Sequence, residues 1–194
     1  MLGFLRAHPT RLPAVLGVLP ALTRFGLGRA DRGELKSAFI HGTLGGYPRA
    51  VLEAWTSAFV PRLIAHGLWQ DAVARIGRHR AQGDTLVLMS ASVDLYVPSI
   101  GQALGFAETL CTALSWRGDT LDGTLAGANL RGAAKARALE ALRVRHPGSA
   151  ITAYGNAASD LGHLCLADHG VLVNGSARTR RDAARLGIGC ERWR

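Results

Sequence analysis

The sequence predicts an α/β protein in which a Rossmann-like parallel sheet follows an N-terminal helical domain. Three short apolar runs, at residues 85–89, 149–155 and 170–174, are typical of buried parallel strands. A segment with helical spacing follows each run, and this alternation of strand, loop and helix indicates an α/β layer. Ligands of such sheets bind at the carboxyl ends of the strands, so we expect the site there.

The N-terminal domain is predicted at residues 1–80 and the α/β core at residues 81–194. Apolar residues recur at three- and four-residue spacing in the first part, as in AVLEAWTSAFVPRLIAHGL, with a break from Gly42 to Pro48. The pattern changes at Gly83, where the first strand-like run begins.

The core contains two further kinds of predicted element. The polar, glycine-rich residues 112–127 predict short strands or a flap that turns at Gly118 and Asp119. The helices of the core are predicted at residues 95–105, 132–145, 160–167 and 177–187.

The composition bounds the class of protein. The chain has 194 residues, 48% of them hydrophobic, which is enough for one core and a small accessory layer. The formal net charge is +9, but the basic residues are almost all scattered arginines, and aromatic residues make up only 6%. A nucleic-acid partner is therefore not expected. The three cysteines are far apart and form no CxxC pair, which favours a reduced, cytoplasmic location.

An apolar segment lies near the start of the chain. Residues 13–23 read PAVLGVLPALT between Arg11 and Arg24, well short of the roughly 20 apolar residues that a spanning helix needs. We expect a helical hairpin that packs on its own domain. Peripheral contact of residues 13–27 with a membrane surface is the alternative.

Polar residues follow two of the buried strands and open one helix. Ser90 ends the first strand, Lys135 opens the helix after the flap, and residues 156–160 follow the second strand. A hydroxyl, an ammonium and a carboxylate together can hold a phosphoryl group and a divalent cation. Each residue also has a structural alternative: Ser90 could cap a helix, Lys135 could be a surface lysine, and Asp160 could cap its own helix.

Three stretches of the chain resemble the haloacid dehalogenase superfamily, in particular its phosphoserine-phosphatase-like branch, subfamily IB. They are RIGRHRAQGDTLVLMSASVDLYV, GTLAGANLRGAAKARAL and AYGNAASDLGHLCLADHGVLVN, which occur in the family's order within residues 27–187. The N-terminal helices also resemble those of phosphatidylglycerophosphate-phosphatase-like members. The resemblance implies a phosphatase core with a helical cap.

The resemblance also assigns roles to the polar residues. It implies that Ser90, Ala91 and Lys135 bind the substrate phosphate, and that Lys135 also orients the nucleophile. Asn156 and Asp160 take the positions that support Mg²⁺, although the family usually has aspartate where this chain has Asn156. An amide oxygen brings no negative charge, so weaker metal binding is expected.

The family's first loop is not found in the sequence. Members begin with a strand that ends in aspartate, any residue, aspartate, glycine, threonine; the first aspartate attacks phosphorus and the second acts as general acid and base. The segment DTLDGTL at 119–125 has its aspartates three apart and follows no buried strand, so it does not match. The absent strand is the central one of the family's sheet. We therefore expect two half-sheets, and a Met1 that is internal to a longer, truncated protein.

The sequence favours a phosphomonoester hydrolase that forms an aspartyl-phosphate in its full-length form, with this chain alone inactive. Its substrate would be a small-molecule or lipid phosphate ester. The alternative is a degenerate family member that binds a phosphate compound or a protein without turnover. GxSxG, GK[ST] and HExxH are absent, and His163 and His169 are expected to be packing or surface residues.

Overall fold

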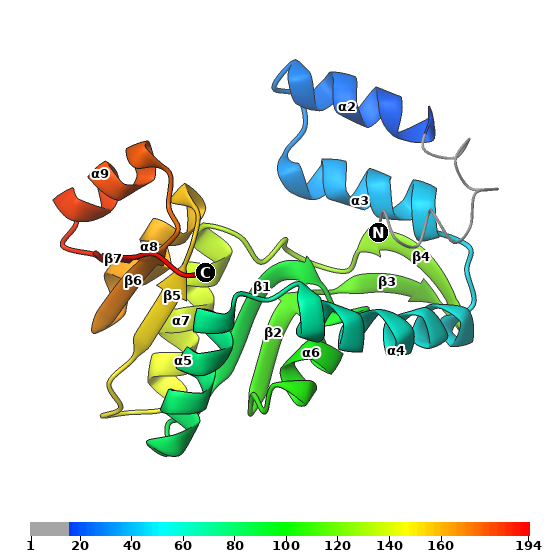
Figure 1. The fold of residues 1–194 in the computed structure, drawn as a ribbon. Helices are drawn as coiled ribbons and strands as arrows, with labels where there is room; N and C mark the ends of the chain where they lie inside the picture. The colour runs from blue at the N-terminus through cyan, green and yellow to red at the C-terminus, as the bar shows by residue number, and fades with distance from the viewer. Residues whose placement is uncertain (1–15) are drawn as a thin grey trace. The chain divides into compact units, whose positions relative to one another are not determined.

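The computed structural model describes residues 16–194, so the helical pattern predicted for residues 2–15 lies outside the described residues. The fold is mixed α/β with parallel strands, as predicted. The helices are α2 (Leu19–Gly26), α3 (Arg32–Leu44), α4 (Arg49–His66), α5 (Gln70–Ala81), α6 (Val97–Ala103), α7 (Ala133–Arg145), α8 (Leu161–Leu166) and α9 (Ala177–Arg185) (Figure 1). Among residues 16–194 we find no helix with the length and apolar character needed to cross a bilayer.

The strands fall into three separate hydrogen-bonded sheets. These are the pair β1 (Val87–Val93) and β2 (Glu108–Thr112), the pair β3 (Leu114–Arg117) and β4 (Thr120–Leu125), and the sheet β5 (Thr152–Gly155), β6 (His169–Val173) and β7 (Gly189–Glu191). Within the described residues, no ladder joins β1 to β5. This pairing agrees with the predicted half-sheets.

The chain divides into two compact units. The first contains α2 to α4, residues 92–100 and residues 111–129, and the second contains residues 66–91, 101–110 and 130–194. This division does not follow the boundary predicted at residue 80. The helix α5 belongs to the second unit, and the predicted flap belongs to the first.

The first unit is built on α3 and the flap. The flap is the antiparallel hairpin β3–β4, and it turns at Gly118 and Asp119 as predicted. The side chains of Ile40 and Leu44 on α3 are buried together with Leu121 on β4. This apolar contact explains why the flap belongs with the helices before it rather than with the strands around it.

Gly123 lets β4 approach the backbone of α3. Its φ is +84°, in the left-handed region that favours glycine. A Cβ at this position would lie 2.8 Å from the Cα of His41, which no relaxed structure allows. The hairpin can therefore pack on α3 only because residue 123 has no side chain.

We predict that Gly123→Ala destabilises the protein. The positive φ alone costs about 1–2 kcal/mol for an L-residue, and the overlap with His41 adds to that cost. Urea unfolding would show a lower midpoint with little change in slope. Gly26→Ala is the control, because a Cβ there meets nothing within 4 Å. Equal midpoints for the two variants would contradict the prediction.

The second unit has a parallel sheet of three strands. The register pairs Tyr154 with Val171 and Val171 with Gly189. Leu164 on α8 and Leu172 on β6 are fully buried in the core of this unit, together with Leu139 on α7. The strand β7 was not predicted, because Gly-Cys-Glu has no apolar run that would indicate one.

Asp168 ties the start of β5 to α7. Its Oδ2 accepts hydrogen bonds from the backbone N–H of Ile151 at 2.7 Å and from Nη2 of Arg143 at 3.1 Å. The bond from Ile151 is the main reason that the pKa of Asp168 lies below its ordinary value, and Arg143 adds to the effect. The ionised carboxylate is therefore the form that the folded protein favours.

We predict that Asp168→Asn removes a pH-dependent part of the stability. A carboxyl with a depressed folded pKa stabilises the fold above its unfolded pKa of about 3.9, and that contribution is lost as the pH falls through the folded pKa. The difference in unfolding free energy between parent and variant should be full at neutral pH and shrink below about pH 4. Urea unfolding of the parent and the variant from neutral pH to below pH 4 measures this difference in unfolding free energy. A difference that does not change with pH would contradict the prediction.

Candidate functional site

Lys135 and Asp160 form a buried ion pair in the second unit. Lys135 lies in the first turn of α7, and Asp160 ends the short 3₁₀ turn Ala158–Asp160 that follows β5. Lys135 Nζ donates to Asp160 Oδ1 at 2.9 Å, and only 12% and 7% of the two side chains is exposed. The surface-lysine alternative for Lys135 is therefore wrong.

The second oxygen of Asp160 holds the loop that follows β5. Oδ2 accepts the backbone N–H groups of Asn156 and Ala157, each at 3.1 Å. The carboxylate therefore bonds back to its own loop and makes no capping bond to α8. Burial by itself raises the pKa of Asp160, but the hydrogen bond and charge of Lys135 and the two amides hold it below its ordinary value. Asp160 is an anion at neutral pH.

Gly155 allows this close wrapping of the loop. A Cβ at residue 155 would lie 2.6 Å from the Cβ of Asp160 and 3.2 Å from its Oδ2. The glycine of the motif Gly-Asn-Ala-Ala-Ser-Asp is therefore needed for space, because any side chain would push the carboxylate away. Residue identity alone could not show this, since the conflict arises from a residue five positions along the chain.

His163 is a buried neighbour of the ion pair. It lies on α8 with 1% exposure, and its Nδ1 is 4.0 Å from Asp160 Oδ1. Burial, followed by the charge of Lys135, holds the pKa of His163 below its ordinary value, so the ring is neutral at neutral pH. Nδ1 has no hydrogen-bond partner among residues 16–194. This placement fits the packing role expected for His163.

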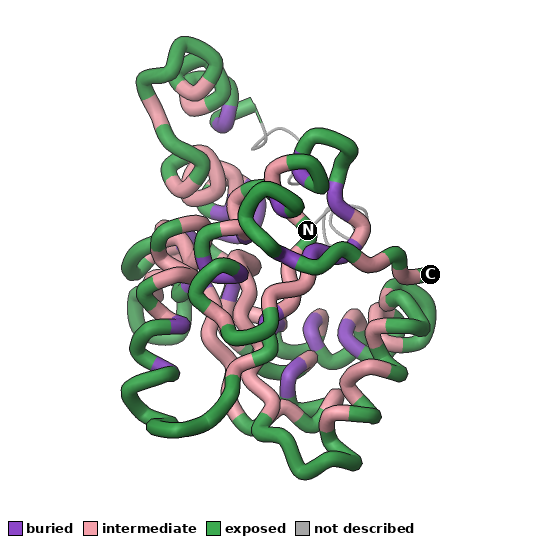
Figure 2. The backbone as a smooth tube through the Cα atoms, turned by 90° about the vertical axis from the view of Figure 1, so that its left-hand side faces the viewer, coloured by how far each residue is buried: buried purple, intermediate pink, exposed green. Residues whose placement is uncertain are grey.

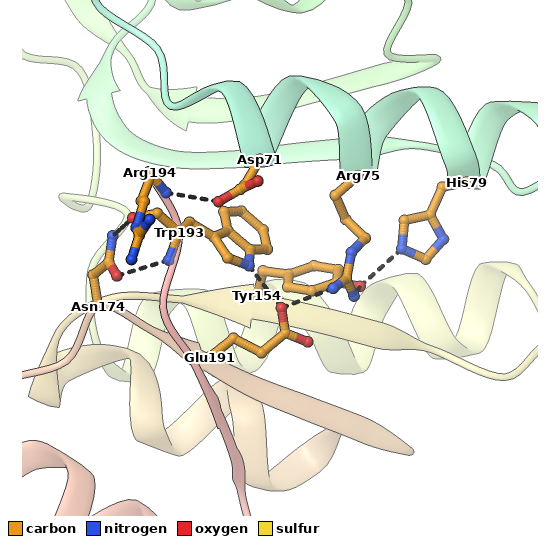
Figure 3. Close-up of polar contacts among 8 residues, drawn as sticks. All are labelled: Asp71, Arg75, His79, Tyr154, Asn174, Glu191, Trp193 and Arg194. Carbon is orange, nitrogen blue, oxygen red and sulfur yellow. Dashed lines mark hydrogen bonds and ion pairs between the residues drawn. The ribbon is translucent and has the colours of Figure 1, made fainter.

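Polar side chains of α5 hold β5, the strand that precedes the loop, in place. The hydroxyl of Tyr154 accepts from Arg75 Nη1 at 2.9 Å and lies 2.8 Å from His79 Nε2. Arg75 also pairs with Glu191 at 2.7 Å, and the indole of Trp193 donates to the same carboxylate at 2.6 Å (Figure 3). Residues next to the predicted site are thus held from both α5 and the C-terminal segment.

Ser90 and Ala91 are placed differently from the prediction. The strand β1 runs from Val87 to Val93, so both residues lie within it and not in a loop after it. The apolar run TLVLM marked only the strand's first part, because Ser-Ala-Ser has no apolar alternation that extends it. Ser90 and Ala91 belong to the same compact unit as Lys135 and Asp160.

Asp160 and Asn156 could supply part of a magnesium shell. Among residues 16–194 no group of three or more His, Cys, Asp or Glu side chains could hold a metal ion. The Asp160 carboxylate accepts three hydrogen bonds, yet a carboxylate has about four lone-pair sites, and the Asn156 side chain is exposed. Hard oxygen donors suit Mg²⁺, which usually keeps several waters and takes only one or two carboxylates from the protein.

Comparison with known proteins gives the family. The haloacid dehalogenase-like hydrolase family matches residues 1–164, and the chain belongs to this family. The chain is 34% identical over 169 residues to Protein CicA of Caulobacter vibrioides, an alignment that covers 84% of this chain and 73% of that protein.

Solved structures share the fold. A protein of unknown function from Bordetella pertussis Tohama I has a TM-score of 0.74 at 20% identity, covering 87% of this chain and 78% of that one. A probable phosphoserine phosphatase from Vibrio cholerae has a TM-score of 0.70 at 17% identity, covering 85% of this chain and 49% of that one. These neighbours support the predicted haloacid dehalogenase-like core. At this sequence identity they show the fold alone.

We predict that Gly155→Ala displaces Asp160. Over-packing a site of this kind costs about 1–3 kcal/mol of stability. The amides of Asn156 and Ala157 should also exchange with solvent faster, because their acceptor moves. Hydrogen exchange and urea unfolding measure the two effects. Gly162→Ala is the matched control on the neighbouring helix, where a Cβ meets nothing within 4 Å. Unchanged exchange at Asn156 in Gly155→Ala would refute the assignment.

Proposed function

We propose that this chain carries the phosphate- and metal-binding part of a phosphomonoester hydrolase of subfamily IB. The observation that carries the proposal is the buried ion pair between Lys135 on α7 and Asp160 at the end of the loop Gly155–Asp160. A lysine that is desolvated beside an anionic loop is suited to hold a second anion, because its charge is little screened by water. Membership of the hydrolase family supports the same reading.

Each proposed site residue has a role in holding the phosphoryl group. Lys135 neutralises its charge and orients the nucleophile, while the hydroxyl of Ser90 and the backbone at Ala91 donate to its oxygens. Asn156 and Asp160 would hold Mg²⁺, which supplies electrostatic stabilisation of the phosphoryl oxygens. The order of Ser90, Lys135 and Asp160 along the chain is the family's order.

The nucleophile in this proposal is an aspartate that is not among the residues of this sequence. Its carboxylate oxygen attacks phosphorus and the bond to the ester oxygen breaks. The second aspartate of the same Asp-x-Asp segment donates a proton to that oxygen, so an alcohol leaves and an aspartyl-phosphate remains. Water then cleaves the acyl phosphate to inorganic phosphate. The strand that bears this aspartate is the central one of the family's sheet. The separate pairing of β1–β2 and of β5–β6–β7 supports the proposal, because a sheet that lacks its central strand would pair in this way.

The proposed substrate is a small-molecule or lipid phosphate ester. The second candidate function is binding of a phosphate compound or a protein partner without turnover. It is favoured by Asn156, whose side chain brings no charge to the metal position, and by the absent Asp-x-Asp segment.

We predict that hydrolysis of an aryl phosphate with Mg²⁺ requires a polypeptide with the Asp-x-Asp strand. The chain as given should be inactive, and a form extended at its N-terminus by such a strand should turn over. In that form Lys135→Met should lose at least about 10²-fold in kcat, comparable to the loss of one oxyanion donor.

Arg137→Met is the matched control for Lys135→Met. It removes one positive charge from the exposed side of the same helix and should keep the activity. The non-catalytic binder would be supported instead if the extended form did not hydrolyse the aryl phosphate with Mg²⁺ but bound inorganic phosphate saturably. Equal activities of the two variants would remove Lys135 from the site.

A further inference from the structure

Four leucines at and around α2 form an exposed apolar surface, which we call the leucine face. Leu16, Leu19, Leu22 and Leu27 are 65%, 53%, 47% and 68% exposed. Among the described residues, ten large hydrophobic side chains are exposed. Four of these ten lie within the twelve positions from 16 to 27, so exposed apolar side chains are concentrated there. α2 is exposed along most of its length (Figure 2).

The leucine face is not the side by which α2 packs on its own unit. Val18, just before the helix, is 1% exposed, and Phe25 is half-buried with the guanidinium of Arg32 over its ring at 6.0 Å. α2 and α3 are in contact within the first unit. The helix is therefore anchored through Val18 and Phe25, while the four leucines remain exposed.

The charges beside the leucine face are positive. Residues 16–30 contain Arg24 and Arg29 and no acidic residue. Arg24 also pairs with Glu34 at 3.3 Å, but 62% of its side chain stays exposed. The chain as a whole carries +9. An exposed apolar helix with arginines in the same segment matches the boundary between acyl chains and anionic headgroups.

We propose that the leucine face docks on the surface of a bilayer that contains anionic phospholipids. The leucines enter the edge of the acyl region, and Arg24 and Arg29 meet the lipid phosphates. The eight residues of α2 are too few to span the bilayer, so the helix lies along the surface. The face consists of leucine, which is under-represented among the anchor residues of protein interfaces but is typical of the apolar face of helices that lie on a bilayer.

Docking holds the chain at a surface of lipid headgroups. It would then favour an amphiphilic phosphate ester over a freely diffusing one, and this consequence alone rests on the proposed function. Docking itself needs no chemistry at Lys135.

Sedimentation of the full chain with vesicles tests the proposal. We expect binding to phosphatidylcholine mixed with phosphatidylglycerol, weaker binding to phosphatidylcholine alone, and a decline with salt. The double variant Leu19→Asp, Leu22→Asp should lose at least about tenfold in partition coefficient, and Arg29→Glu should weaken binding to the mixed vesicles only. The control is Val144→Asp on α7, which changes a lone apolar side chain that is 81% exposed and should bind like the parent.

Two results would overturn the proposal. One is equal vesicle binding by the double variant and the parent. The other is no vesicle binding by the parent, with a dimer in size-exclusion chromatography that Leu19→Asp dissociates, which would make a second copy the occupant. Circular dichroism checks the fold, and Leu27→Ser at the end of the helix repeats the test with a milder change. The vesicles contain no phosphate monoester, so this test and the activity assay fail independently.

Discussion

The pairing of Lys135 with Asp160 is the interaction on which the candidate site depends. Both charges are largely removed from water, and removal of one partner from such a pair typically costs about 3–5 kcal/mol because the other charge is left uncompensated. Asp160 also holds two amides of its own loop. One carboxylate thus positions the lysine of α7 and shapes the loop after β5, so neither can move without the other.

The surroundings of this pair are arranged to keep it in place. Gly155 gives the carboxylate room, and the neutral His163 fills the space beside it without adding a charge. Tyr154, directly before the loop, is held by Arg75 and His79 from α5. The rigidity of the site therefore comes from contacts between segments that are far apart in the sequence.

The local elements could be predicted from the sequence because they leave a local pattern. The helix of Lys135 has apolar residues at helical spacing, β5 is an apolar run, and the turn at Gly118 consists of turn-forming residues. The predictions failed where no such pattern exists. Ser90 lies within β1 although Ser-Ala-Ser carries no apolar pattern that would extend the strand, and β7 is a strand only because β6 pairs with it. Long-range contacts such as the one from His79 to Tyr154 depend on residues 75 positions apart, which no local pattern records.

The scarcity of lysine has a practical consequence for chemistry on this protein. Lys36 and Lys135 are the only two lysines among 23 basic residues, and guanidinium groups resist acylation at pH values where amines react. An amine-reactive reagent would thus meet only these two side-chain amines. One of them is half-buried against Asn129, and the other is shielded in its ion pair. The rate of acylation at Lys135 is therefore a direct reporter of whether its partner carboxylate is in place.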